Sequence, residues 1–212
     1  MNKAIIVYEE MIKLFPDAKC ELHYETVFQL LISTVLSAQT TDKSVNAVGD
    51  KLYLDYPDLN SFLTMSQSEI EEKIKILGLY KNKSKSIYKL VRELDNQYDG
   101  IVPNNMKNLI TLSGVGRKTA SVVLAEGFKI PAFPVDTHVN RIALRLGLSN
   151  AKTADKVSDD LMKQFPRELW IKSHHLFINY GRKICIARKP RCELCSMTDI
   201  CDYYNKIEIG EK

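Results

Sequence analysis

The sequence of 212 residues contains no apolar stretch that approaches the roughly 20 residues needed for a membrane-spanning helix. No signal peptide is expected, because only a short apolar run precedes Glu9 and Glu10 and no cleavage site follows it. Low-complexity tracts and obvious repeats are absent, and 45% hydrophobic and 26% charged residues are ordinary for a globular protein. These absences exclude membrane-spanning, fibrous and disordered chains, and they predict an intracellular, cytoplasmic protein.

The sequence also has no convincing run of alternating β-branched residues, which a half-buried strand would require. Apolar residues instead recur at helical spacing almost everywhere, so we predict an all-α fold. A pair of prolines at Pro131 and Pro134 interrupts this pattern and marks the best internal boundary. The expected helices cover approximately residues 5–15, 27–36, 41–52, 66–77, 87–94, 117–126, 137–146, 153–165 and 168–184.

Several residues predict where these helices begin and end. Thr41 is a plausible N-cap, and Ser66 with Glu69 three residues later has the form of a capping box. Gly78 is expected to close the helix that the capping box opens. Pro16 is expected to end the first helix.

The charge of the chain is unevenly distributed. Residues 1–106 contain 12 Lys and Arg and 15 Asp and Glu, whereas residues 107–212 contain 18 and 11, which gives −3 and +7 and a total of +4. The segment 181–191 has five basic residues and no acidic residue. A basic half indicates a polyanionic partner, most often nucleic acid, although a solvated basic face would give the same pattern.

Four of the five cysteines are clustered near the C-terminus. Cys185, Cys192, Cys195 and Cys201 follow the spacing C-x6-C-x2-C-x5-C, and Cys20 stands alone. Clustered cysteines in an intracellular chain predict a metal site, and four thiolates can hold either an iron–sulfur cluster or a zinc ion. Structural zinc sites more often contain two C-x2-C pairs, so the spacing favours iron–sulfur while zinc stays an alternative.

The segment Leu112–Ala120 (LSGVGRKTA) contains two glycines on either side of Val115, between two expected helices. Gly114 and Gly116 permit a tight turn with unusual backbone angles, and the valine can enter the core. Backbone N–H groups at the start of the next helix would then bind a phosphate. The alternative interpretation is an ordinary glycine-rich connection between helices.

Lys118 and Asp136 are candidate catalytic residues. Lys118 lies in the first turn of an expected helix, where the helix dipole favours the neutral amine, and partial burial would favour it further. A neutral amine is a nucleophile that forms Schiff bases. Asp136 is expected to cap the next helix, where its carboxylate could accept a proton or stabilise a cationic sugar. The simpler alternatives are a phosphate contact for Lys118 and a plain helix cap for Asp136.

Taken together, these motifs resemble the endonuclease III family of DNA glycosylases with abasic-site (AP) lyase activity. The resemblance covers about residues 1–207 and depends on five elements, which occur together. These elements are the cysteine spacing and the segments 112–119 (LSGVGRKT), 135–138 (VDTH), 36–42 (LSAQTTD) and 78–80 (GLY).

The resemblance implies two all-α domains. Residues 21–131 would form a six-helix barrel domain that contains the helix–hairpin–helix motif. Residues 1–20 and 132–212 would form a discontinuous domain that carries one 4Fe–4S cluster, with Cys185, Cys192, Cys195 and Cys201 as its ligands.

The resemblance also implies a bifunctional enzyme of base excision repair that removes oxidised pyrimidines from duplex DNA. Lys118 would attack the deoxyribose C1′ of a flipped nucleotide, and β-elimination would then cleave the strand 3′ to the abasic site. Asp136 would be the catalytic aspartate, Gln39 would fill the gap left by the flipped base, and Leu79 would wedge into the opposite strand. The remaining DNA contacts would come from Gly114, Val115, Gly116, Arg117, His138, Arg141, Arg182 and Lys189. The expected partner is double-stranded DNA with damaged pyrimidines or abasic sites, bound by a monomer, with no membrane involved.

One residue departs from the family pattern, because Ser113 stands where the hairpin usually has proline. Serine can adopt the same backbone angles, but we expect a less rigid turn. Two other functions stay open: a glycosylase specific for mismatched thymine or adenine, and a non-catalytic DNA-binding protein with a hairpin and a cluster. Cys20 is expected to be a small buried or idle thiol.

Overall fold

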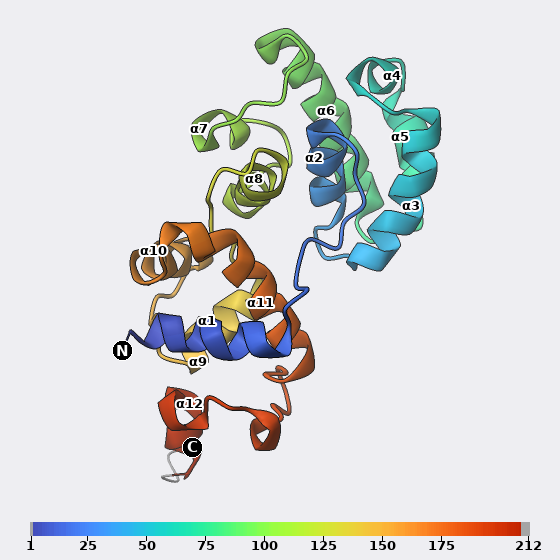
Figure 1. Ribbon diagram of the computed structural model, residues 1–212. Coiled ribbons are helices and arrows are strands. Elements are labelled where there is room, and N and C mark those ends of the chain that lie inside the picture. The colour runs from blue at the N-terminus through green and yellow to red at the C-terminus, as the bar shows by residue number, and fades with distance from the viewer. Residues whose placement is uncertain (1, 209–212) are drawn as a thin grey trace. The chain divides into compact units, whose positions relative to one another are not determined.

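The computed structural model describes residues 2–208 and the side chains of residues 2–206. Helices connected by loops make up this part of the chain, and no strand occurs in it, which confirms the all-α prediction (Figure 1). The chain divides into two compact units, Glu21–Ile130 and Met1–Cys20 with Pro131–Lys212.

The unit Glu21–Ile130 is built around helix α2, Val27–Leu36. Every residue of α2 from Phe28 to Leu36 is buried, as expected for its wide apolar stripe. Thr26 caps the helix by accepting a hydrogen bond from the Gln29 N–H. The other helices of this unit are α3 (Asp42–Asp55), α4 (Leu59–Leu63), α5 (Gln67–Ile74), α6 (Tyr80–Tyr98), α7 (Met106–Leu109) and α8 (Arg117–Val122), followed by the π-helical turn η1 (Val123–Gly127).

Helix α6 is the long element of this unit, and it packs against α2, α4 and α5. It buries an apolar stripe that includes Ile87, Leu90 and Leu94. The helix ends where Asp99 and Gly100 adopt left-handed backbone angles, with φ of 52° and 76°. Residues on α6 also bond to two loops of the unit, through Lys83 to Thr40 and through Glu93 to Ser113.

The second unit combines both ends of the chain. It contains α1 (Lys3–Leu14), α9 (Thr137–Arg145), α10 (Ala154–Gln164), α11 (Trp170–Lys183) and α12 (Asp202–Glu208), with short 3-10 turns at Arg167–Leu169, Cys192–Leu194 and Thr198–Ile200. Phe133, Phe165 and Phe177 pack edge to face in its core, with ring centroids 5.5 to 6.0 Å apart. Helix α1 packs against α11 and buries Ala4, Val7 and Met11.

The expected N-caps are confirmed, and one expected helix end is wrong. Thr41 accepts a hydrogen bond from Ser44 N–H, and Ser66 and Glu69 form the reciprocal capping box. Helix α5, however, ends at Ile74 and not at Gly78. The left-handed residue of this connection is Leu79, with φ of 59°, which directly precedes α6. The short helices α4 and α7 were not predicted, because four or five residues are too few to show a helical period.

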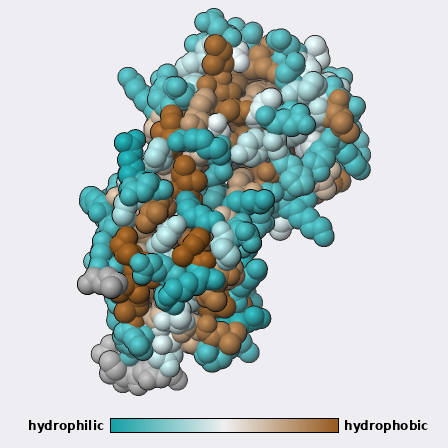
Figure 2. Space-filling view, in the orientation of Figure 1, coloured by the Kyte–Doolittle hydropathy of each residue, from teal (hydrophilic) through white to brown (hydrophobic). Residues whose placement is uncertain are grey.

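None of the described helices combines the length and the apolar character needed to cross a membrane. Hydrophilic and hydrophobic residues are intermixed over the face of the molecule that Figure 2 shows.

Candidate active site and cysteine loop

The segment between α7 and α8 forms a tight hairpin. Val115 is buried, and its N–H donates to the Leu112 carbonyl at 3.0 Å, as a tight turn requires. Gly114 has a left-handed φ of 80°, which confirms the expected glycine conformation there. Gly116 does not share it, because its φ of −89° is open to any residue. Only one of the two glycines therefore has an unusual backbone angle.

Helix α6 holds this hairpin through two residues that are two helical turns apart. The Glu93 carboxylate accepts the Ser113 N–H at 2.6 Å through Oε2 and the Ser113 hydroxyl at 2.7 Å through Oε1. Two turns earlier on α6, Ser86 lies so close to the hairpin that a Cβ on Gly114 would be only 2.8 Å from Ser86 Cβ, closer than real Cβ contacts come. Ser113 is therefore tied by two hydrogen bonds that a proline could not make, since proline has no N–H and no hydroxyl.

Lys118 lies in the first turn of α8, directly after the hairpin, as expected. Its side chain is exposed and not partly buried. The helix continues into the π-helical turn η1, where Gly127 approaches α2 so closely that a Cβ would lie 2.9 Å from Val27 Cγ1. The amine therefore projects from a helix whose far end is packed tightly against the core.

Asp136 is the N-cap of α9. Its Oδ1 accepts the backbone N–H groups of His138 at 2.9 Å and Val139 at 2.8 Å. This geometry confirms the expected cap and fixes the carboxylate, while the other oxygen, Oδ2, is not part of these two hydrogen bonds. The side chain is half-buried, so the carboxylate can reach a ligand.

His138 and Arg141 lie one turn apart on α9, next to α11. Burial lowers the pKa of His138; the positive charges of Arg141 and Arg182 lower it as well, and Asp136 opposes them. Arg141 Nη2 donates to the Gly181 carbonyl at 2.9 Å and to the Cys185 carbonyl at 2.8 Å. In this structure the Arg141 guanidinium thus fixes the start of the cysteine loop.

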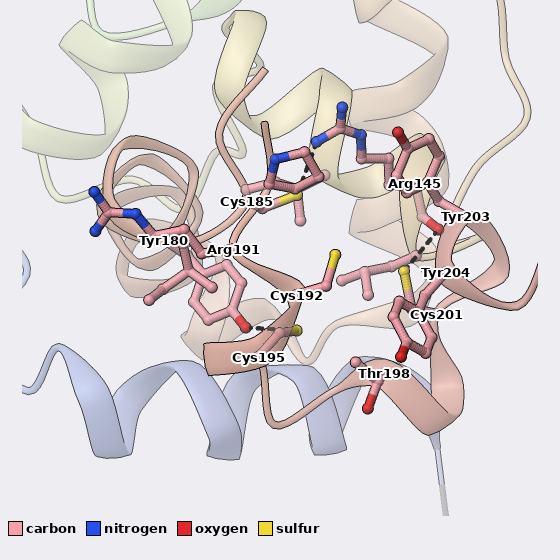
Figure 3. Close-up of a pocket in the computed structure, with 14 residues that line it drawn as sticks. Arg145, Tyr180, Cys185, Arg191, Cys192, Cys195, Thr198, Cys201, Tyr203 and Tyr204 are labelled. Carbon is pink, nitrogen blue, oxygen red and sulfur yellow. Dashed lines mark hydrogen bonds between the residues drawn. The ribbon is translucent and has the colours of Figure 1, made fainter. Parts of the chain in front are cut away.

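The four clustered cysteines line one hollow, which Figure 3 shows in close-up. None of them forms a disulfide, and all four sulfurs are free thiols. Within residues 2–206, no three His, Cys, Asp or Glu side chains converge as they would around a single bound ion. Four thiols around a shared hollow are the donor set of an iron–sulfur cluster, so these residues fit that group. Cys20 is only partly buried and is not among the residues that line the hollow.

Two side chains from neighbouring helices donate hydrogen bonds to the sulfurs. Arg145 Nη1 lies 3.3 Å from Cys185 Sγ, and the Tyr180 hydroxyl lies 3.0 Å from Cys195 Sγ (Figure 3). Arg145 also donates to the Ile186 carbonyl at 2.9 Å, which holds the loop near α9. Such donors stabilise thiolate charge and tune an iron–sulfur cluster.

The thiols also influence one another. Burial raises the pKa of Cys192 and of Cys201, and the nearby Cys195 and Cys185 thiols raise both values further. Arg145 opposes this effect at Cys192 by its positive charge. Mutually repelling thiolates in one hollow require a cation to be stable together, and bound iron would supply it.

The remaining predicted DNA contacts lie on the surface or next to it. Arg182 and Lys189 are exposed on and after the end of α11, and Arg117 is half-exposed at the start of α8. Gln39 and Leu79 are exposed in two loops and have left-handed φ values of 53° and 59°. Left-handed backbone is uncommon for such side chains and is often found at functional sites.

Sequence reasoning missed Glu93, Arg145 and Tyr180. Arg145 follows Arg141 by four residues, so helical spacing could have placed both arginines on the same face. Glu93 carried no local signal, because its partner Ser113 is 20 residues away. Tyr180 precedes the first clustered cysteine by five residues, which gave no indication that its hydroxyl meets a sulfur.

Two family descriptions match this chain. Residues 32–167 match the HhH-GPD superfamily of base excision DNA repair proteins. Residues 185–201 match the iron–sulfur binding domain of endonuclease III. The first match covers the hairpin, Lys118 and Asp136, and the second begins and ends at clustered cysteines.

Individual proteins give the same result. Endonuclease III from Synechocystis is 45% identical over 190 residues, which cover 89% of this chain and 87% of that protein. The solved structure of a trapped endonuclease III–DNA covalent intermediate is 41% identical, with a TM-score of 0.92, over 98% of this chain and 99% of that one. The structure of a thermostable thymine-DNA glycosylase is 26% identical, with a TM-score of 0.86, over 96% and 97% of the two chains.

Proposed function

Because the chain belongs to the endonuclease III family of base excision repair proteins, we propose that Lys118 and Asp136 perform its chemistry. The enzyme is a bifunctional DNA glycosylase and AP lyase, and it carries a 4Fe–4S cluster. The observation that carries the residue assignment is the exposed Lys118 amine, which directly follows the hairpin of the matched superfamily.

In the proposed reaction, the Lys118 amine attacks C1′ of a flipped deoxynucleotide and the bond to the base breaks, so that the base leaves with the electron pair. Ring opening gives a Schiff base between Nζ and C1′, which makes the C2′ proton acidic. Loss of that proton expels the 3′ phosphate by β-elimination and cleaves the strand. Water then releases the lysine.

Asp136 has two tasks in this proposal. Its carboxylate stabilises the positive charge that develops on the sugar as the base leaves, and it accepts a proton from the Lys118 amine. The two hydrogen bonds from the start of α9 support this role, since they fix the carboxylate without satisfying Oδ2.

We assign the two compact units to the expected domains. Glu21–Ile130 corresponds to the six-helix barrel domain with the hairpin, and Met1–Cys20 with Pro131–Lys212 to the iron–sulfur domain. Cys185, Cys192, Cys195 and Cys201 are the proposed ligands, and the bound cluster would cross-link the loop that carries Arg188, Lys189 and Arg191. The exposed positive charges of this loop would then meet DNA phosphates.

The hairpin, Gln39 and Leu79 complete the proposed DNA contacts. The segment from Gly114 to Arg117 would hold a phosphate through one guanidinium and through backbone N–H groups other than that of Val115, which donates to Leu112. Arg141 differs from the other predicted contacts, because its bonds to Gly181 and Cys185 favour a role in positioning the loop.

Borohydride trapping tests the catalytic assignment. The protein is mixed with a duplex that contains one abasic site, and borohydride reduces any Schiff base to a stable covalent adduct. We expect an adduct with the natural protein and none with Lys118→Ala. Lys107→Ala is the matched control, because Lys107 is an exposed lysine on the other side of the hairpin. An adduct that persists in Lys118→Ala would contradict the assignment.

Asp136→Asn tests the second residue. Asparagine is also a good N-cap, so we expect the melting temperature to be kept while base release slows at least about 100-fold, in the range of a lost general base. Unchanged base release with intact folding would reduce Asp136 to a helix cap.

For the substrate we propose oxidised or ring-fragmented pyrimidines in double-stranded DNA, bound by a monomer. The likeness to a thymine-DNA glycosylase favours mismatched thymine as the second candidate. Parallel assays of thymine glycol release and of thymine release from G·T pairs distinguish the two. Preference for the G·T mismatch would overturn the proposed substrate. Elution of the active protein as a dimer in size-exclusion chromatography would overturn the proposed monomer.

A further inference from the structure

Lys83 is a buried lysine that the proposed chemistry does not use. It lies in the first turns of α6 and is 4% exposed. Lysine is rarely buried so completely without a charged partner, because its ammonium loses the hydration of three donors. Burial also lowers the pKa of Lys83, as expected for a cation removed from water. A residue kept at this cost requires an explanation in its surroundings.

The Lys83 amine is directed at the loop that carries Gln39. Lys83 Nζ donates to Thr40 Oγ1 at 2.6 Å, and the Thr40 hydroxyl in turn reaches the Ala38 carbonyl at 3.4 Å. These contacts touch the residues on both sides of Gln39. The amine therefore binds the side chain of the residue that follows Gln39, which has a left-handed φ of 53°.

The backbone of Lys83 contacts the second loop. In the first turn of α6 its N–H donates to the Leu79 carbonyl at 3.1 Å, as the Asn82 N–H does at 3.0 Å, so the start of the helix that carries Lys83 is joined to the residue with φ of 59°. The two loops also lie next to each other, since a Cβ on Gly78 would be 3.9 Å from the Gln39 carbonyl oxygen. One residue thus contacts both loops, with its side chain at one and its backbone at the other.

The two loops share an unusual combination of features. Gln39 and Leu79 are exposed, both are left-handed, and neither is glycine. Strained backbone of this kind persists only where the surrounding structure holds it. The contacts of Lys83 are part of what holds it here.

We propose that Lys83 is a positioning residue that keeps the Gln39 and Leu79 loops in a fixed relation, so that both side chains enter the duplex together. This inference rests on the proposed function, because it takes Gln39 and Leu79 as the residues that fill and wedge the DNA. Lys83 itself does not touch the reacting sugar.

A comparison of two DNA substrates tests the inference. A duplex with one abasic site requires gap filling and wedging, whereas a single-stranded oligonucleotide with the same site has no opposite strand to wedge. Lys83→Met removes the amine and keeps a long apolar side chain. We expect its rate of Schiff-base trapping on the duplex to fall about tenfold, while the rate on the single strand stays within twofold of the natural protein.

Thr40→Val is the second variant, and it keeps the test valid if Lys83→Met lowers the melting temperature. It removes the acceptor of the Lys83 amine from a half-exposed loop residue, and we expect the same selective loss on the duplex. The double variant should lose no more than either single variant, because both remove one interaction. Lys81→Met, an exposed lysine on the same helix, should keep both rates.

The outcomes separate this inference from the proposed chemistry. Equal losses on both substrates, or no loss on the duplex, would overturn the positioning role of Lys83. Failure of the natural protein to be trapped on either substrate would instead overturn the assignment of Lys118.

Discussion

The hairpin at residues 112–118 and the cysteine loop at residues 185–201 are both irregular segments that present basic residues, but they are held in opposite ways. At the hairpin, a carboxylate on a helix accepts bonds from the segment, through Glu93 and Ser113. At the cysteine loop, guanidinium groups on a helix donate bonds to the segment, through Arg141 and Arg145. The hairpin is thus fixed by the polypeptide alone.

Arginine side chains fix the cysteine loop only near its beginning, while the Tyr180 hydroxyl and the buried Met197 hold its later part. The arginine bonds reach Cys185, Ile186 and Ala187. Further along, the sulfurs of Cys192, Cys195 and Cys201 face a common hollow, where their ligand chemistry suits the iron–sulfur cluster. The comparison shows two means of shaping an irregular basic segment: a satisfied polar pair at the hairpin, and arginine bonds at the cysteine loop, to which the proposed cluster would add a metal cross-link.

Of the changes that test these two segments, removal of one thiol from the cysteine loop should have the largest effect. Cys201→Ser replaces the most buried of the clustered thiols by a hydroxyl that stays protonated at neutral pH. We expect loss of most iron and sulfide, loss of visible absorption, and duplex affinity at least about 100-fold weaker, because several phosphate contacts would be lost. Cys20→Ser is the control and should keep all three. Full iron content in Cys201→Ser would contradict the ligand assignment.

Alanine substitutions at the two glycines of the hairpin should give the next largest effect, a change in the free energy of unfolding. Gly114→Ala should lower the free energy of unfolding by about 3 kcal/mol, since a left-handed φ and a 2.8 Å approach to Ser86 each carry a cost of about 1–3 kcal/mol. Gly116→Ala should change it by less than about 0.5 kcal/mol, because φ is −89° and a Cβ would meet nothing within 4 Å. Urea unfolding measures both variants. Equal losses would mean that the hairpin geometry is not as described.

The Glu93 clamp, which is the pair of hydrogen bonds that the Glu93 carboxylate accepts from Ser113, can be tested by introducing the proline that the family usually has at this position. Ser113→Pro removes both donors to Glu93 and should cost about 2 kcal/mol, in the range of about 1–3 kcal/mol for an unsatisfied polar group. Glu93→Leu in the same chain removes the stranded acceptor, so the double variant should regain most of this loss. If Ser113→Pro alone is as stable as the natural protein, the clamp contributes nothing.

The smallest effect is expected from a single hydrogen bond in the cysteine loop. Tyr180→Phe removes the hydroxyl 3.0 Å from Cys195 Sγ and keeps the buried ring. We expect a loss of about 1 kcal/mol in unfolding free energy and a more negative reduction potential, because a donor to sulfur favours the reduced cluster. Tyr8→Phe on α1 serves as the control. An unchanged potential would show that this bond does not act on the cluster.

The contrast between local contacts and contacts over a long sequence separation explains which features of this protein the sequence predicts. The helices with a clear apolar period and their caps, such as Thr41 and Asp136, were predicted because they depend on neighbours within four residues. The hairpin and the cysteine spacing were found as local motifs. The Glu93 clamp and the Arg145 contacts were missed, since they join residues 20 and 40 or more positions apart. The exposure of Lys118 could not be predicted either, because it depends on what packs around α8.

The position of α1 has a consequence for synthesis of the chain. Its buried residues Ala4, Val7 and Met11 pack in a unit whose other helices begin only at Thr137. Lys172 also reaches back to the carbonyls of Pro16 and Ala18, at a separation of more than 150 residues. Because a chain emerges from the ribosome N-terminus first, the apolar face of α1 stays unburied while residues 21–130 are made and can fold. Helix α1 is therefore synthesised well before the helices that bury it.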